Sequence, residues 1–247
     1  MTLATRHGDD LTLMARPPLT MALKRAIDIF GAGAGLVLLS PLFAVVAIII
    51  KRDSRGPVFF RQRRLGRSGR PFYIFKFRSM AASAARVGIA LTVRDDKRVT
   101  RFGAFLRRTK LDELPQLINV LAGDMSLVGP RPEVPEFIKY YTPEQRAIIL
   151  SVKPGMTDYA AIHFRDENEL LESGRDPVEV YRREIMPIKF AYYERYNRDI
   201  GALNDLRIIL ATILLLVAGG IPRWLGIEHE LQAAPSLQRS ETQTGFP

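Results

Sequence analysis

The sequence predicts an α+β protein that is mostly helical, carries one small β-hairpin and is associated with a membrane. The first observation is an uncharged run, Ile29–Ile50, with the Ser40-Pro41 pair near its middle. The second is a pair of short aromatic and basic segments on either side of the turn residues Gly66–Gly69, a pattern typical of a hairpin. Elsewhere, apolar residues recur three and four positions apart, which indicates amphipathic helices.

The composition narrows the classes of partner and cofactor. The 247 residues include 36 Lys and Arg against 26 Asp and Glu, a formal charge of +10, so we expect anionic partners: phosphate esters, lipid head groups or nucleic acid. Cysteine is absent, which excludes disulfides and thiolate catalysis. The 3 histidines are scattered along the chain, so a metal ion would be held by oxygen ligands, which suits Mg²⁺.

The uncharged run predicts a membrane helix. It is long enough to cross a bilayer, which takes about 20 apolar residues. Basic residues flank it on both sides, although positive charge prefers the cytoplasmic face. Pro41 removes a backbone hydrogen bond at the centre and would bend the helix. Two interpretations stay open at this point: a re-entrant helix that leaves on the side it entered, and an ordinary spanning helix with a proline kink.

The predicted hairpin has strands at Val58–Arg63 and Phe72–Arg78. In the second strand, period-two alternation puts Lys76 and Arg78 on the face opposite Tyr73, Phe75 and Phe77. Such a surface could bind single-stranded nucleic acid or rest near anionic head groups. The neighbouring membrane segment favours anionic membrane lipid, and we predict no nucleic-acid partner.

Helices are expected in the rest of the chain. Thr100 could cap a short helix, and further helices are expected within 135–150 and 167–196. Asp205 precedes the uncharged run Ile208–Gly220, which is too short to span and is typical of a buried or interfacial helix. The tyrosines of the second half are expected to be interfacial anchors: Tyr181, Tyr192, Tyr193 and Tyr196.

The adjacent acids Asp112 and Glu113 are the candidate catalytic pair. Helical spacing runs on from Leu114 to Gly123, and Pro115 is compatible with a first turn, so the acids are placed at a helix start. One carboxylate could accept a phosphoryl group while the other binds metal. The alternative is a helix-capping pair with a local salt link, which the residues alone favour.

Arg131 stands between two prolines that fix the local backbone. A guanidinium held in this way matches phosphate or carboxylate oxygens. The competing interpretation is a rigid surface turn.

Taken together and in order, several segments resemble the bacterial sugar transferase family of monotopic phosphoglycosyl transferases. They are Lys76–Met80, Leu111–Gln116 with Asn119, Gly123–Glu133 and Lys153–Thr157. The resemblance covers roughly residues 24–216, and the chain is similar to the minimal form of the family. It implies transfer of a sugar 1-phosphate from a nucleotide (UDP) sugar to polyprenyl phosphate, with release of UMP, at the start of exopolysaccharide, capsule, O-antigen or glycan assembly.

The resemblance also implies roles for individual residues. Asp112 would be the nucleophile and Glu113 its partner in Mg²⁺ binding or proton handling. Arg107, Arg131 and Asp205 match positions that we expect to serve substrate binding, together with Lys76 and Arg78 of the hairpin. Ser40-Pro41 matches the break of a re-entrant helix, which favours re-entry at the cytoplasmic face of the bacterial inner membrane.

The expected organisation is a flexible lead-in (1–20), a re-entrant helix (21–56), a cytoplasmic catalytic domain with interfacial helices (57–231) and a disordered tail (232–247). An oligomer is compatible with the sequence. Asp158–Ala161 departs from the commoner family pattern, which leaves the sugar unassigned. Two alternatives remain: a non-catalytic module that binds anionic lipid or polymer at the membrane surface, and direct attack by polyprenyl phosphate with Asp112 only holding magnesium.

Overall fold

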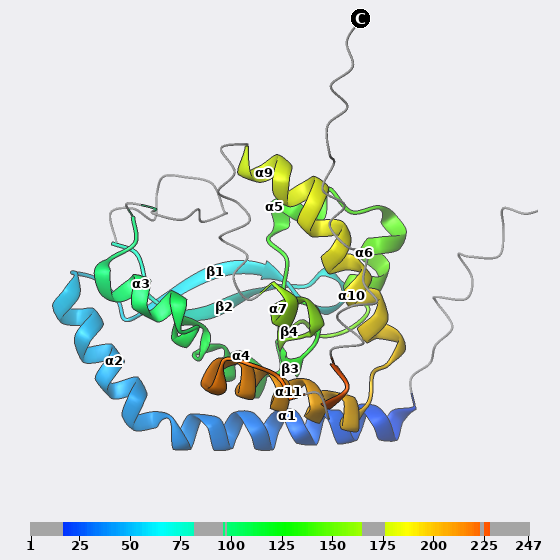
Figure 1. Cartoon of the computed structure of the whole chain (residues 1–247), viewed down its shortest axis with the longest axis horizontal. Helices are drawn as coiled ribbons and strands as arrows, with labels where there is room; N and C mark the ends of the chain where they lie inside the picture. The colour runs from blue at the N-terminus through cyan, green and yellow to red at the C-terminus, as the bar shows by residue number, and fades with distance from the viewer. Residues whose placement is uncertain (1–16, 82–95, 97, 165–175, 223–224, 228–247) are drawn as a thin grey trace, which may run out of the picture.

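The computed structural model describes residues 17–81, 96, 98–164, 176–222 and 225–227 (Figure 1). Nearly all of the expected lead-in and the whole of the expected tail lie outside these residues, as do the acidic residues of the segment Asp166–Glu169. The described part is α+β and mostly helical, as predicted. It contains 2 two-stranded sheets, of which only the hairpin was predicted.

The uncharged run forms two helices instead of one. Helix α1 (Pro18–Leu38) and helix α2 (Ser40–Asp53) meet at Leu39 and are bent by 60°. Pro41 stands in the first turn of α2, where its missing N–H costs nothing, and Ser40 Oγ donates to the Val37 carbonyl at 2.8 Å. The helix break at Ser40-Pro41 is therefore confirmed. Within the described ranges no helix alone has the length and hydropathy to cross a bilayer, and the bent pair meets that test only jointly.

Helix α11 (Ala202–Ala218) packs against α1, and both lie at the lower edge of the view in Figure 1. Several large apolar side chains on α1, α2 and α11 face outward. The most exposed are Leu19, Phe30, Val37, Leu38, Leu203 and Val217. These three helices therefore concentrate exposed apolar surface, which in a protein of this size marks an interaction site.

The predicted hairpin is present. Strands β1 (Phe59–Leu65) and β2 (Pro71–Phe77) pair antiparallel, with Phe59 opposite Phe77. A 3₁₀ turn at Arg67–Gly69 connects them.

Arg78 follows β2 directly and closes the end of α2. Its Nη2 donates to the carbonyls of Ile50 at 3.2 Å and Ser54 at 2.6 Å at the end of this helix, where the Ile50 carbonyl also accepts from the Ser54 N–H. This buried guanidinium ties the last turn of α2 to the hairpin.

A second sheet was not predicted. Strands β3 (Ser126–Val128) and β4 (Gly155–Thr157) are parallel, with Val128 beside Thr157. The chains approach so closely that a Cβ on Gly155 would lie 2.1 Å from the nitrogen of Gly129. Three-residue strands carry too little alternation to be recognised, and parallel pairing joins segments far apart in the sequence.

Two short helices bracket the acid pair. Helix α3 (Arg101–Arg108) begins at Thr100, whose Oγ1 accepts from the Gly103 N–H at 2.9 Å, so the predicted cap is confirmed. Helix α4 (Gln116–Ala122) ends at Gly123, as its spacing indicated, with a left-handed φ of 89°.

The largest core is built by the second half of the chain. The predicted helix within 135–150 is two helices, α5 (Pro135–Ile138) and α6 (Pro143–Ile149). The remaining elements are α7 (Tyr159–His163), α9 (Pro177–Val180), a π turn (Tyr181–Ile185) and α10 (Met186–Arg198).

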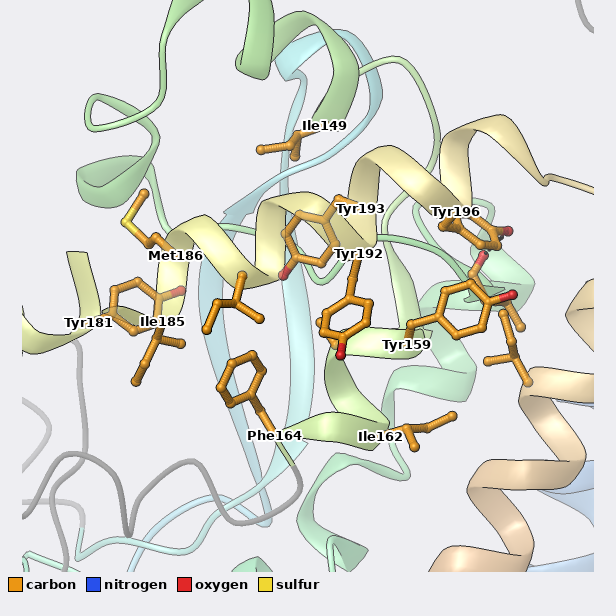
Figure 2. Packing of buried hydrophobic residues seen from close by; sticks show 14 of the residues in the cluster. Ile149, Tyr159, Ile162, Phe164, Tyr181, Ile185, Met186, Tyr192, Tyr193 and Tyr196 are labelled. Carbon is orange, nitrogen blue, oxygen red and sulfur yellow. Dashed lines mark hydrogen bonds between the residues drawn. The ribbon is translucent and has the colours of Figure 1, made fainter. Parts of the chain in front are cut away.

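The tyrosines expected as interfacial anchors are buried in this core. Tyr181, Tyr192, Tyr193 and Tyr196 are each at most 5% exposed, and Figure 2 shows them along the π turn and α10 among apolar side chains. The prediction was wrong because α10 is a central helix of the core. A Tyr ring has a large apolar surface, so its burial in a core is favourable.

Candidate active site

The acid pair lies on its own turn ahead of α4. Asp112 and Glu113 belong to a 3₁₀ turn, Leu111–Glu113, and α4 begins three residues after Glu113. Lys110 precedes this turn with a φ of 59°, a left-handed conformation that is uncommon for a residue with a side chain. Such backbone strain concentrates at functional sites, and here it lies in the short connection between α3 and the acids.

Glu113 is held between two cations. Lys76 Nζ lies 2.7 Å from its Oε1, Arg131 Nη1 donates to its Oε2 at 3.0 Å, and Arg131 Nη2 also pairs with Oε1. Burial alone would raise the pKa of Glu113, but the charges of Arg131 and Lys76 hold that pKa well below its usual range. Glu113 is therefore ionised at neutral pH and fixed by a bidentate pair.

Asp112 has a different environment. It is 6% exposed, and its carboxylate makes no hydrogen bond or salt bridge within the part of the chain that the structure describes. Burial raises the pKa of Asp112, the nearby charge of Lys76 lowers it, and that of Glu113 raises it again. Two adjacent acids thus have pKa values pushed in opposite directions, which suits one as a reactive group and the other as a fixed charge.

Arg107 is positioned near the pair by the packing of α3. Its Nε donates to Ser79 Oγ at 2.8 Å, and its charge lowers the pKa of Asp112. A Cβ on Gly103 would lie 2.0 Å from the Ser79 carbonyl oxygen, so only glycine lets α3 approach this closely.

The Pro-Arg-Pro segment is held in place by hydrogen bonds to the residues that follow Arg131. Arg64 Nη1 donates to the Pro132 carbonyl at 3.0 Å, and Tyr141 Oη donates to the buried Glu133 carboxylate at 2.9 Å. Arg131 therefore projects from a rigid loop onto Glu113, as the sequence interpretation of a presented guanidinium requires.

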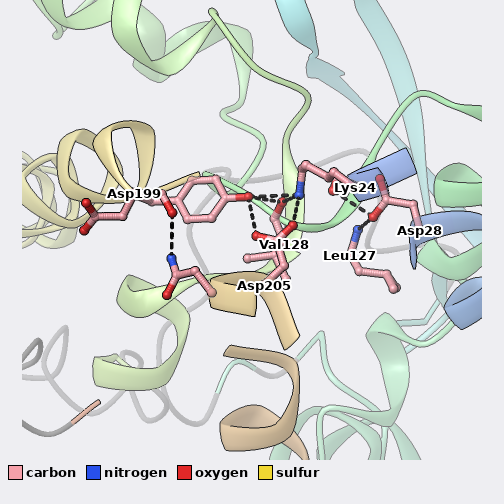
Figure 3. Close-up of polar contacts among 9 residues, drawn as sticks. Lys24, Asp28, Leu127, Val128, Asp199 and Asp205 are labelled. Carbon is pink, nitrogen blue, oxygen red and sulfur yellow. Dashed lines mark hydrogen bonds and ion pairs between the residues drawn. The ribbon is translucent and has the colours of Figure 1, made fainter. Parts of the chain in front are cut away.

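Not every candidate residue is at this centre. Lys76, Arg107 and Arg131 converge on the acid pair, whereas Arg78 closes α2. Asp205 is 1% exposed and accepts a hydrogen bond from Lys24 Nζ at 2.6 Å, in a buried network that includes Tyr196 (Figure 3).

The same network fixes α1 to β3. Lys24 Nζ also donates to the Val128 carbonyl at 2.9 Å, and one turn further along α1 the carboxylate of Asp28 accepts from the Leu127 N–H at 2.8 Å (Figure 3). Sequence reasoning used Lys24 only as a flank of the membrane run. The available signal was its spacing from Asp28, four residues on, which puts two opposite charges on one face of an apolar helix.

The side chains of the site show whether a divalent cation could bind there. No group of three or more His, Cys, Asp or Glu side chains that could hold a metal occurs in the described ranges. Mg²⁺ needs only one or two carboxylates when substrate phosphates and water complete its shell. The Asp112 carboxylate fits this requirement because no described residue hydrogen-bonds to its oxygens, whereas both Glu113 oxygens are paired with cations.

Comparison with known proteins decides the family. The sequence model of the family described as bacterial sugar transferase matches residues 19–219, which include every candidate residue above. The chain belongs to this family. The match confirms the resemblance seen in the motifs and makes the chain a member of a family of transferases.

Curated relatives of this bacterial sugar transferase carry informative names. An exopolysaccharide production protein of Rhizobium leguminosarum is 52% identical over 209 residues, 78% of this chain and 94% of the relative. The UDP-glucose:undecaprenyl-phosphate glucose-1-phosphate transferase of Escherichia coli is 40% identical over 194 residues, 77% of this chain and 39% of the relative. A UDP-N-acetylgalactosamine-undecaprenyl-phosphate N-acetylgalactosaminephosphotransferase of Aeromonas hydrophila is 40% identical over 158 residues, 63% and 37% of the two chains. The chain therefore spans about two fifths of the length of the latter two.

Proposed function

We propose that this protein transfers a sugar 1-phosphate from a UDP-sugar to polyprenyl phosphate through an intermediate on Asp112. The supporting observation is the contrast within the acid pair: Asp112 is buried and has no hydrogen-bond partner among the described residues, whereas Glu113 is paired with two cations. The names of the relatives support the donor, the undecaprenyl acceptor and the phosphotransfer.

The reaction balances in two displacements. A carboxylate oxygen of Asp112 attacks the phosphorus that bears the sugar, and the bond from that phosphorus to the oxygen of the UMP phosphate breaks, so that UMP leaves. An oxygen of polyprenyl phosphate then attacks the same phosphorus and releases the carboxylate. Positive charge near the reacting phosphate would come from Lys76, Arg107 and Arg131.

Magnesium remains part of the proposal. Asp112 would hold it together with the diphosphate of the donor, and the ion would neutralise charge on the phosphate oxygens. Glu113 could join only if a cation left one of its oxygens, so its main role is to keep Lys76 and Arg131 in place.

We place the protein at the cytoplasmic face of the bacterial inner membrane. The support is the apolar surface on α1, α2 and α11, together with the break at Ser40-Pro41. A re-entrant pair would let a lipid phosphate reach a site that a water-soluble nucleotide sugar also reaches. Anionic lipid is a further proposed partner because the chain is strongly basic.

The test is UMP release from a panel of uridine diphosphate sugars, with membranes that contain the full chain and added polyprenyl phosphate. We expect Mg²⁺-dependent UMP release with at least one sugar, abolished by EDTA and restored by Mg²⁺. Membranes without the protein are the control. If no sugar releases UMP, the non-catalytic membrane module becomes the better interpretation, and charge reversal at Lys76 should then reduce lipid binding.

Activity is expected to fall on the acid side as Asp112 takes up a proton. The pKa of Asp112 is raised above its ordinary 3.8 and that of Glu113 lies well below 4.5, so Asp112 protonates first as the pH falls. Because only the carboxylate is nucleophilic, the rate should drop about 10-fold per pH unit below the Asp112 pKa. The measurement is the UMP burst without lipid acceptor, which removes the titration of the lipid phosphate. A burst that stays constant down to the pH range of an exposed Asp would contradict the assignment.

A further inference from the structure

Asp158 is a buried acid that the proposed mechanism does not use. It follows β4 directly and is 1% exposed. Its Oδ1 accepts from the Ala161 N–H at 2.6 Å and so caps α7. Its Oδ2 is buried and has no hydrogen-bond partner among the described residues. A capping role alone therefore accounts for only one of the two oxygens.

The parallel sheet brings Asp158 to the loop that carries Arg131. Gly129 N–H donates to the Thr157 carbonyl at 3.0 Å, and Gly155 N–H donates to the Pro130 carbonyl at 2.9 Å. The segments after β3 and β4 are thus hydrogen-bonded to each other on both sides of the close contact between Gly129 and Gly155. Asp158 and Arg131 are the next residues along these two segments.

Electrostatics connect the two residues directly. Burial raises the pKa of Asp158 to about 6, while the main-chain N–H and the charge of Arg131 act in the opposite direction. The groups that face the carboxylate from α10 are Lys189, whose charge lowers the same pKa, and Tyr193, whose own pKa rises partly because of Asp158. Asp158 therefore lies behind the Arg131 loop, enclosed by α7 and α10.

We propose that Asp158 is a positioning residue for Arg131. Its carboxylate connects the start of α7 with the buried side of the Pro-Arg-Pro loop. The Arg131 guanidinium is thereby kept paired with Glu113, next to the place where the donor phosphate would bind. This inference rests on the proposed function for the role of Arg131 toward phosphate. It also gives the sequence departure at Asp158–Ala161 a meaning: the first residue of the departure is buried and acts on the Arg131 loop from inside the protein.

The activity arm of the test compares two variants with a matched control at pH 8, where Asp158 is ionised. Asp158→Ala removes the carboxylate, and Asp158→Asn keeps an oxygen for the α7 cap but removes the charge. Asp176→Ala is the control, since Asp176 Oδ1 caps α9 in the same way at 3.0 Å from the Val178 nitrogen. We expect kcat for UMP release to fall about 10-fold in Asp158→Ala and less in Asp158→Asn, with a smaller change in KM. The reason is that a misplaced Arg131 guanidinium stabilises the transition state less, while substrate binding changes little. Asp176→Ala should keep the wild-type kcat.

A second arm does not depend on activity. Amide hydrogen exchange of the full chain in lipid nanodiscs should be faster in residues 129–133 of Asp158→Ala than in the wild type, and unchanged there in Asp176→Ala. Equal exchange of that loop in both variants, or equal kcat in Asp158→Ala and the control, would overturn the positioning role. If the wild type released no UMP from any UDP-sugar, the proposed function would fail, and the exchange arm would still decide what Asp158 does.

Discussion

Asp112→Asn is expected to lower sugar-phosphate transfer by at least about 10⁴-fold, because an amide cannot form the acyl phosphate. The substitution keeps the size of the side chain, and no described hydrogen bond or salt bridge depends on the charge. The variant should therefore fold and still bind the nucleotide sugar. The measurement is UMP release together with mass analysis of the intact protein after incubation with donor and no acceptor, where only the wild type should carry a phosphosugar.

Asp124→Asn is the control for this experiment. Asp124 follows the other end of α4, and its carboxylate accepts from the Asn119 amide at 3.4 Å, so its loss should leave transfer close to the wild-type rate. If Asp112→Asn kept appreciable activity, or if the wild type formed no adduct while it turned over, direct attack by polyprenyl phosphate would be the better mechanism. Asp112 would then serve as a ligand of magnesium.

Lys24→Met is expected to cost about 3–5 kcal/mol of folding free energy, because it leaves Asp205 charged and buried without its cation. Lys24 and Asp205 are 5% and 1% exposed, and Lys24 Nζ also serves Tyr196 Oη and the Val128 carbonyl. Burial already raises the pKa of Asp205 despite the neighbouring Lys24 charge. The double variant Lys24→Met/Asp205→Leu should recover most of the loss, since it removes both charges at similar volume.

Denaturant unfolding in detergent measures these differences. Arg183→Met is the control: Arg183 pairs with Glu179 at 2.8 Å, but the two side chains are 69% and 49% exposed, and such a pair is worth less than about 1 kcal/mol. If Lys24→Met cost no more than Arg183→Met, the buried network would not be what holds α1 to α11.

The features that the sequence predicted are those with a local cause. Pro41 bends the apolar run, Thr100 starts a helix and Gly123 ends one, and each acts on the residues next to it. The acid pair and Arg131 were assigned through the resemblance to the family, because the residues alone favoured a capping pair and a rigid surface turn. In the structure they converge as the motifs imply.

The features that the sequence did not predict depend on residues far apart. The ion pair between Lys24 and Asp205 joins two helices from opposite ends of the chain, so no local pattern could show that Asp205 is paired and away from the acids. Arg78 shares strand parity with Lys76 but lies past the end of β2, where the alternation no longer decides its direction. The tyrosines of α10 were misassigned for a related reason. The burial of a helix residue depends on the elements that pack around the helix, and the sequence of the helix alone does not show them.

Because Arg78 is bonded to the end of α2, the length of that helix sets a distance in the protein. Lys76 stands two residues before Arg78, so the last turn of α2 and the charge beside Glu113 belong to one rigid piece. If α1 and α2 form the proposed re-entrant pair, α2 is the half that leads back out of the bilayer, and its length sets the distance of the reacting carboxylate from the lipid. A helical turn is about 5.4 Å, more than the span of a phosphate group, and the protein would therefore be selected for the number of residues between Pro41 and Ser54 as well as for their kind.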